Sequence, residues 1–242
     1  MDQDPKALCR SLVATIDLAV DNNGCCLMAF HKKSPPDILH HSMPAVTAKH
    51  YLDRYLAGPY LLDPLYELAI KTRRPTVCRF RDAIPDRFRS SEYYRQYYER
   101  THLRDETDFL LRTASDTTLV LVVGRFHKRY SKSDMDRIAS IEAVVFTTMQ
   151  SIWKSWNGKT QEQDRDESLH RRLATFGDPQ LTKRERQITQ LLLRGHSAKS
   201  VARELRIAPG TVMVHKRNLF AKLGITSQYE LFSLFIKDLN SA

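Results

Sequence analysis

The sequence predicts an α+β fold, in which an N-terminal α/β domain with an antiparallel sheet precedes a C-terminal all-α domain of four helices. Two apolar runs at 104–113 and 117–126 are separated only by turn residues, which indicates a β-hairpin. Apolar residues recur at helical spacing before and after this hairpin. A chain of 242 residues has room for two domains, which we expect at 1–157 and 181–242, with a polar linker at 158–180.

The N-terminal domain is expected to open with a helix at 6–20 and a strand at 25–30. The histidine pair at 40–41 falls in a predicted loop. Adjacent side chains point apart in regular structure, so we do not expect this pair to bind a metal ion.

Residues 45–73 show a helical pattern that breaks near Gly58 and restarts at Pro64, where proline suits the first position of a helix. A short strand is expected at 76–80. The segment 90–102 should be an amphipathic helix with half-buried aromatic side chains, namely Tyr93, Tyr94, Tyr97 and Tyr98.

After the hairpin, Ser131 and Asp134 are expected to cap a long helix that ends near Trp156. Its apolar stripe follows steps of three and four residues, through Ile138, Ile141, Val145, Met149, Ile152 and Trp156. The stripe is longer than one small sheet should cover. Two interpretations stay open: the helix pairs with its twin in a homodimer, or it packs wholly on its own sheet.

The C-terminal domain carries a helix-start signal before each of its predicted helices. These signals are Thr182 with Glu185, Ser197, Thr211, and Ser227 with Glu230. Gly195 and Gly224 are expected to end the first and third helices. Residues 207–210 should form the turn between the second and third helices, because they include Pro209 and Gly210.

Positive charge is concentrated in this C-terminal domain. Residues 181–242 contain 11 Lys or Arg and four Asp or Glu, within a chain whose formal net charge is +10. Two helices joined by a tight turn, the second of them cationic, fit the major groove of double-stranded DNA. The alternative is a solvated basic face on a small helical bundle.

The same stretch resembles the LuxR-type helix-turn-helix of bacterial transcription regulators, through LTKRE, RGHSAKSVARELRIAPGTV, VHKRN and AKLGITS. The resemblance implies that 211–223 is the recognition helix of a regulator that binds DNA as a homodimer and acts on RNA polymerase. It also implies that Val214 and Arg217 face base edges. The side chains expected near phosphates are Thr211, His215, Lys216 and Lys222. Met213 stands where many members have lysine, so it can offer only apolar contact to DNA.

The order of elements upstream is similar to that of PAS- or GAF-like sensor domains, which can enclose a small-molecule effector. The segment also resembles the autoinducer-binding domain of LuxR-type receptors, which bind acyl-homoserine lactones. The candidate ligand residues are Tyr51, Tyr55, Asp63 and Tyr66. Tyr55 departs from that family, because it stands where the family has a tryptophan. The alternatives are ordinary packing of these tyrosines, and a regulator that has no ligand and is controlled by protein partners.

Other classes of protein lack support in the sequence. No GxSxG, Walker or HExxH motif is present, so we expect no catalytic residues and no enzyme. The four cysteines lack metal-ligand spacing, and we expect neither a metal ion nor a cofactor. The carboxylates at 105–108 are expected to be solvated. No apolar run reaches the roughly 20 residues of a membrane span, and no signal-peptide core is present, so we expect a cytoplasmic protein.

Overall fold

The computed structural model describes residues 4–114, 116–157 and 168–239. The chain divides into two compact units. Unit 1 consists of Met1–Asp53, Leu65–Ala83 and His102–Asp166, and unit 2 consists of Arg54–Pro64, Ile84–Thr101 and Glu167–Ala242. The first half of the predicted linker lies outside the described residues.

Unit 1 is built on a five-stranded sheet in which all neighbouring strands are antiparallel, in the order β2-β1-β5-β4-β3. The strands are β1 (Gly24–His31), β2 (Asp37–His41), β3 (Thr76–Arg79), β4 (Asp105–Arg112) and β5 (Thr117–Arg125). The predicted hairpin is confirmed as β4 and β5, which pair along their whole length.

The prediction of a loop at 40–41 is wrong, because both histidines belong to β2. This strand pairs with β1 and contains a bulge opposite Leu27 and Met28. A bulge interrupts the simple alternation of buried and exposed residues. Because this alternation is the sequence signal for a strand, the strand was not predicted.

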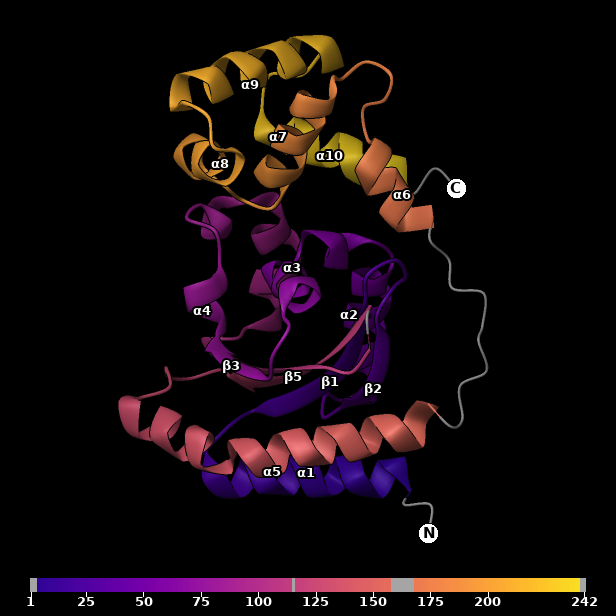
Figure 1. Ribbon diagram of the computed structural model, residues 1–242, viewed down its shortest axis with the longest axis vertical. Helices are drawn as coiled ribbons and strands as arrows, with labels where there is room; N and C mark the ends of the chain where they lie inside the picture. Colours follow the sequence, from indigo (N-terminus) through magenta and orange to yellow (C-terminus); the bar gives the residue numbers. More distant parts are fainter. Residues whose placement is uncertain (1–3, 115, 158–167, 240–242) are drawn as a thin grey trace. The chain divides into compact units, whose positions relative to one another are not determined.

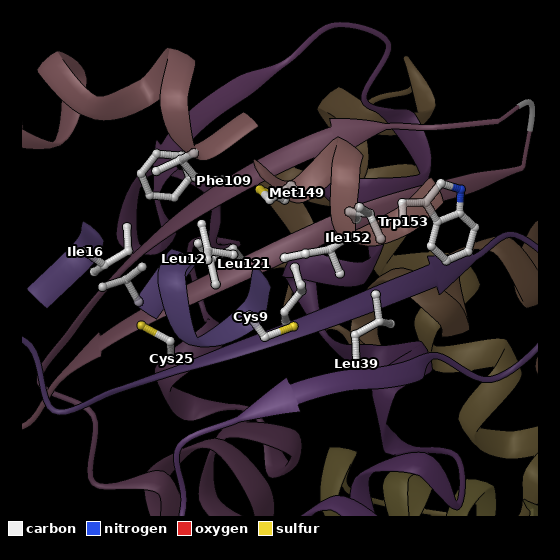
Figure 2. Close-up of a cluster of buried hydrophobic side chains, with 14 of the residues drawn as sticks. Cys9, Leu12, Ile16, Cys25, Leu39, Phe109, Leu121, Met149, Ile152 and Trp153 are labelled. Atoms are coloured by element: carbon white, nitrogen blue, oxygen red, sulfur yellow. The ribbon is translucent and has the colours of Figure 1, made fainter. Parts of the chain in front are cut away.

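Two long helices cover one face of the sheet. α1 (Pro5–Ala19) and α5 (Lys132–Asn157) lie side by side along this face (Figure 1). Figure 2 shows how their side chains meet the strands: Cys9, Leu12 and Ile16 from α1 and Met149, Ile152 and Trp153 from α5 surround Phe109 and Leu121 of the sheet. The apolar stripe of the long helix therefore packs on its own sheet, and burial of this stripe stabilises unit 1.

Between β2 and β3 the chain forms α2 (Ala45–Leu56), a 3₁₀ turn at Pro59–Leu62 and α3 (Pro64–Lys71), and the single turn α4 (Phe80–Ala83) follows β3. The predicted break near Gly58 is confirmed: Gly58 has φ of 140°, a conformation that favours glycine.

The predicted aromatic helix at 90–102 is confirmed in part: residues 92–101 are helical and Tyr94, Tyr97 and Tyr98 are half-buried as expected, but the segment is not a regular α-helix. The chain forms 3₁₀ turns at Phe88–Ser90 and Glu99–Thr101 around a π-helical turn at Tyr94–Tyr98. Phe88 is buried and its ring contacts three tyrosines of this segment, Tyr93, Tyr94 and Tyr98, at centroid distances of 5.4–6.1 Å. Packing of these rings around Phe88 accompanies the departure from regular α-helical geometry.

Unit 2 contains the remaining helices: α6 (Ser168–Thr175), α7 (Lys183–Leu193), α8 (Ala198–Leu205), α9 (Pro209–Leu223) and α10 (Gln228–Leu239). Their apolar faces meet in one core, which includes Ile188, Leu192, Val201, Val212, Leu219, Leu231 and Phe235. The predicted capping box is confirmed, since Thr182 and Glu185 each accept a hydrogen bond from the other's backbone amide. Gly195 and Gly224 follow α7 and α9 with φ of 90° and 65°, as expected of residues that end helices.

One detail of the C-terminal predictions is wrong. The second capping box is incomplete: Ser227 accepts from the Glu230 amide, but the Glu230 carboxylate accepts from Thr226 instead of Ser227. In the described part of the chain, no helix has the length and apolar content needed to cross a membrane.

Candidate nucleic-acid interface

Helices α8 and α9 form the turn-linked pair predicted from the sequence. α8 ends at Leu205, and the residue after it, Arg206, adopts left-handed backbone angles with φ of 52°. α9 begins at Pro209, so three residues separate the helices, which is the length typical of a helix-turn-helix. Val201 and Ala202 of α8 and Val212 of α9 are buried, and they hold the pair together.

The start of α9 corrects one prediction. Thr211 is not the N-cap, because Pro209 and Gly210 already belong to the helix, and Ala208 occupies the cap position without a side-chain hydrogen bond. Proline fits the first helical position, where its missing N–H has no partner to lose, so the helix starts two residues before Thr211. The Thr211 side chain is consequently exposed in the first turn and available to another molecule.

The outer face of α9 combines apolar and cationic side chains. Met213 is 55% exposed and Val214 is 49% exposed, although both lie on a helix whose other face is fully buried at Val212 and Leu219. Arg217 is also exposed, and it lies three and four residues after this pair, on the same side of the helix. Apolar groups beside a guanidinium are suited to thymine methyls and guanine edges in a major groove.

The other predicted contact residues of α9 differ in how freely they can reach DNA. His215 and Lys216 are half-buried, and the Lys216 ammonium lies 5.2 Å from the centroid of the Phe220 ring. Lys222 Nζ donates to Glu185 Oε2 at 2.7 Å, so its charge is paired inside the unit. Glu185 is only 3% exposed, and it also completes the capping box of α7.

The Lys222–Glu185 ion pair affects the pKa of the buried carboxyl. Burial raises the pKa of Glu185, but the hydrogen bonds from Lys222 and Thr182 outweigh it and hold the pKa below its ordinary value. Lys222 therefore has a structural role that the sequence did not reveal, because its partner lies 37 positions away.

Two exposed cations near the turn were not among the predicted contacts. Lys199 lies in the first turn of α8, and Arg206 follows its last residue. Their positions at the two ends of a predicted helix next to a DNA-binding helix were the available signal, because flanking cations commonly contact phosphates.

In the N-terminal part, the structure brings together two of the predicted ligand residues. Tyr55 and Asp63 are both buried, and the Tyr55 hydroxyl donates to Asp63 Oδ2 at 2.9 Å. Tyr66 is buried, and its hydroxyl donates to the backbone carbonyl of His31 at 3.0 Å. Tyr51 is half-buried on α2. These hydrogen bonds give Tyr55 and Tyr66 a packing role within the fold.

The carboxylates of β4 are not solvated, contrary to expectation. Asp105, Glu106 and Asp108 are all buried. Asp105 Oδ2 accepts from Arg79 Nη2 at 2.9 Å and from the Tyr130 amide at 2.8 Å, which is a structural role. Among the described residues, no three His, Cys, Asp or Glu side chains are arranged to hold a metal ion.

All four cysteines lie in the described part of the chain and are free thiols. Burial raises the pKa of Cys25 and of Cys26 to about 12. Protonated thiols of this kind are poor nucleophiles and behave as small apolar side chains.

Comparison with known proteins places these features in a family. Residues 179–235 match the model described as bacterial regulatory proteins, luxR family. The chain is 31% identical over 160 residues to an HTH-type transcriptional regulator encoded in the exeN 3′ region of Aeromonas salmonicida, covering 62% of this chain and 82% of that protein. It is 25% identical over 203 residues to the monoamine regulon transcriptional regulator of Klebsiella aerogenes, covering 84% of this chain and 78% of that protein.

A solved structure resembles the N-terminal part. The crystal structure of the VqsR LBD domain from Pseudomonas aeruginosa superposes with a TM-score of 0.57 at 23% identity, covering 64% of this chain and 89% of that one. This likeness establishes the fold. The family match at 179–235 and the Aeromonas relative show that the chain belongs to the luxR family of bacterial regulatory proteins and is a DNA-binding transcriptional regulator.

Proposed function

We propose that the protein binds a near-palindromic operator as a homodimer, with one α9 helix of each protomer in the major groove. The observation that carries this proposal is the exposed face of α9, where Met213 and Val214 lie beside Arg217. Both apolar side chains are about half exposed, and base edges in a major groove would cover them.

Residues of α9 divide into two proposed roles. Val214, Met213 and Arg217 read bases, and Thr211, His215 and Lys216 contact the phosphate backbone. Lys222 is the exception, because its ion pair with Glu185 must loosen before it can bind a phosphate. Lys199 and Arg206 are proposed to add phosphate contacts from α8.

The test begins with selection of an operator from random duplexes by the full-length protein. Arg217→Ala should weaken binding to the selected duplex by about 1–3 kcal/mol and bring it closer to binding of a scrambled duplex. Lys199→Ala serves as the matched control, because it also removes one positive charge but should weaken both duplexes alike. Equal losses on both duplexes for Arg217→Ala would remove the base-reading role of this residue.

The homodimer is proposed to form through the outer face of α5. Val144 is 55% exposed there, and the hydroxyls of Thr147, Thr148 and Ser151 each donate to the carbonyl four residues earlier. Hydroxyls that are satisfied within their own helix can enter an interface without losing hydrogen bonds.

A small-molecule effector is a second proposal, favoured by the fold shared with the VqsR LBD domain. We propose that such an effector binds the N-terminal domain and changes how the α9 helices of a dimer are held for contact with DNA and RNA polymerase. A thermal-shift screen of metabolites on the full-length chain tests this. An acyl-homoserine lactone would have to bind without the tryptophan, in whose place Tyr55 already donates to Asp63.

A further inference from the structure

A segment upstream of the aromatic turn contacts the first helix of the helix-turn-helix within unit 2. The Ser197 amide, at the N-cap of α8, donates to Asp86 Oδ1 at 2.9 Å. One residue further along, the Arg87 amide donates to the carbonyl of Gly195 at 3.0 Å. Two adjacent residues of the segment therefore hold both sides of the turn between α7 and α8.

Gly195 shows how closely the two segments approach. Its φ of 90° is a conformation that favours glycine, and a Cβ at this position would lie 3.0 Å from the Phe88 Cα and 3.2 Å from the Ser91 Cβ. Phe88 is itself buried in the aromatic cluster of this segment, so its backbone has little freedom to move away. The segment and the turn between α7 and α8 are thus closely packed in addition to being joined by two hydrogen bonds.

The occupied end of α8 is a position where DNA would be expected. In helix-turn-helix complexes the second helix lies in the major groove and the first helix crosses the DNA backbone. The free amides and partial positive charge at a helix N-terminus bind anions, and phosphates of DNA are often held in this way. Asp86 supplies a carboxylate to this end of α8 from within the same chain.

We propose that residues 84–91 are an autoinhibitory segment, in which Asp86 takes the place of a DNA phosphate at the N-terminus of α8. DNA binding then requires Asp86 to leave, since a carboxylate and a phosphate cannot share the same amide. The inference rests on the proposed function, because it assumes that α9 enters the groove.

The charge of Asp86 is consistent with this role. Burial raises the pKa of the Asp86 carboxyl, but hydrogen bonds, chiefly from Ser197, and the electrostatic effect of the nearby His196 outweigh it and hold the pKa below its ordinary value. Asp86 is therefore ionised at neutral pH and repels an approaching phosphate.

The test uses the full-length protein and a fluorescent duplex that the parent binds. Asp86→Ala should bind this duplex about two- to five-fold more tightly than the parent, the size expected for a charge at a helix N-terminus. Glu99→Ala is the matched control, because Glu99 is an exposed carboxylate of the same segment of unit 2 and its removal changes the net charge equally. It should bind as the parent does, apart from the small effect of net charge.

A second measurement uses the parent protein, so its outcome does not depend on whether the Asp86→Ala variant folds correctly. Backbone hydrogen exchange over residues 84–91 should speed up when saturating duplex is added. Equal affinities for Asp86→Ala and Glu99→Ala, or unchanged exchange over 84–91 on DNA binding, would overturn the autoinhibitory role while leaving DNA binding intact. A parent that binds no duplex would overturn the proposed function itself.

Discussion

Arg125 carries its charge in the interior of unit 1, where only 1% of the residue is exposed. Its Nη1 donates to Asp134 Oδ2 at 3.1 Å and its Nε donates to the Asp21 carbonyl at 2.7 Å. The guanidinium also lies 4.1 Å from the centroid of the Tyr130 ring. A buried charge is tolerated only when it is paired, so these contacts make Arg125 a central tie between β5, α5 and the end of α1.

Replacing Asp134 should therefore be costly. Asp134→Ala leaves Arg125 buried without its carboxylate, and we expect the free energy of unfolding of unit 1 to fall by about 3–5 kcal/mol. Urea unfolding followed by fluorescence measures this selectively, since the only tryptophans, Trp153 and Trp156, belong to unit 1. Asp136→Ala, an exposed carboxylate of the same helix, should change stability by less than about 0.5 kcal/mol. Similar curves for the two variants would contradict a stabilising role for the ion pair.

The same carboxyl predicts how unit 1 responds to acid. The amide of Ser131 is the main cause that holds the pKa of Asp134 far below its ordinary value of 3.8, with smaller contributions from the Ser131 hydroxyl and Arg125. A carboxyl whose pKa is lower in the folded state contributes stability above its unfolded pKa and loses it as the pH falls toward the folded pKa. We expect the parent to lose stability below about pH 4, and Asp134→Ala to lose less over that range. Parallel pH profiles for the two proteins would contradict this.

These residues also show which contacts can be predicted from a sequence. Ser131 and Asp134 were predicted as caps because three-residue spacing is a local rule, and the structure pairs them. Arg125 and its acceptor on Asp21 lie 104 positions apart, and Lys222 and Glu185 lie 37 apart. Spacing rules contain no information about such distant pairs, so the structural roles of Arg125 and Lys222 could not be foreseen.

At the scale of elements, periodicity predicted those that obey one regular repeat. α1, α5, α7 and the β4–β5 hairpin are confirmed because each buries one continuous stripe or run of apolar residues. The segment 90–102 was predicted correctly as helical but not as an irregular helix, whose rings pack around Phe88. The strand β2 was missed because of its bulge. On α9 the sequence placed the exposed face correctly but missed the start, since it gave Thr211 the role that Ala208 fills.

The outer face of α5 leads to a prediction about assembly. Val144→Asp should prevent the proposed homodimer, because it places an unpaired charge in the centre of the proposed interface. Around it lie Thr147, Thr148 and Ser151, whose hydroxyls donate to carbonyls of their own helix. Sedimentation equilibrium of the full-length protein should change from dimer to monomer. Ala139→Asp is the control: it is exposed on α5 about 140° around the helix from Val144, and should leave the dimer intact. A parent that sediments as a monomer at all concentrations would contradict the proposed dimer.

At the scale of the whole molecule, the division into units was beyond the reach of sequence patterns. The composition of the chain suggested a polar linker between two consecutive domains, but unit 2 also includes Arg54–Pro64 and Ile84–Thr101 from the N-terminal half. These segments join it through contacts such as that of Asp86 with Ser197, which connect residues 111 positions apart. The chain therefore leaves unit 1 and returns to it more than once before the helix-turn-helix begins.

The spacing of the operator tests how the whole molecule engages DNA. Two α9 helices held by a dimer should contact half-sites separated by about one turn of the duplex, roughly ten base pairs. Inserting about five base pairs between the half-sites turns the second one to the opposite face of the duplex, so affinity should fall to that of an isolated half-site. Inserting about ten base pairs restores the phase, and part of the lost affinity should return if α5 and the linker allow the longer span.

Gel shifts at one fixed salt concentration measure these affinities, because phosphate contacts make them strongly salt-dependent. Val144→Asp supplies the internal comparison: as a monomer it should bind the original and the expanded operators equally. A parent whose affinity is also indifferent to spacing would mean that each helix-turn-helix binds alone. The dimeric reading of the operator would then be wrong, although α9 could still read a single half-site through Arg217.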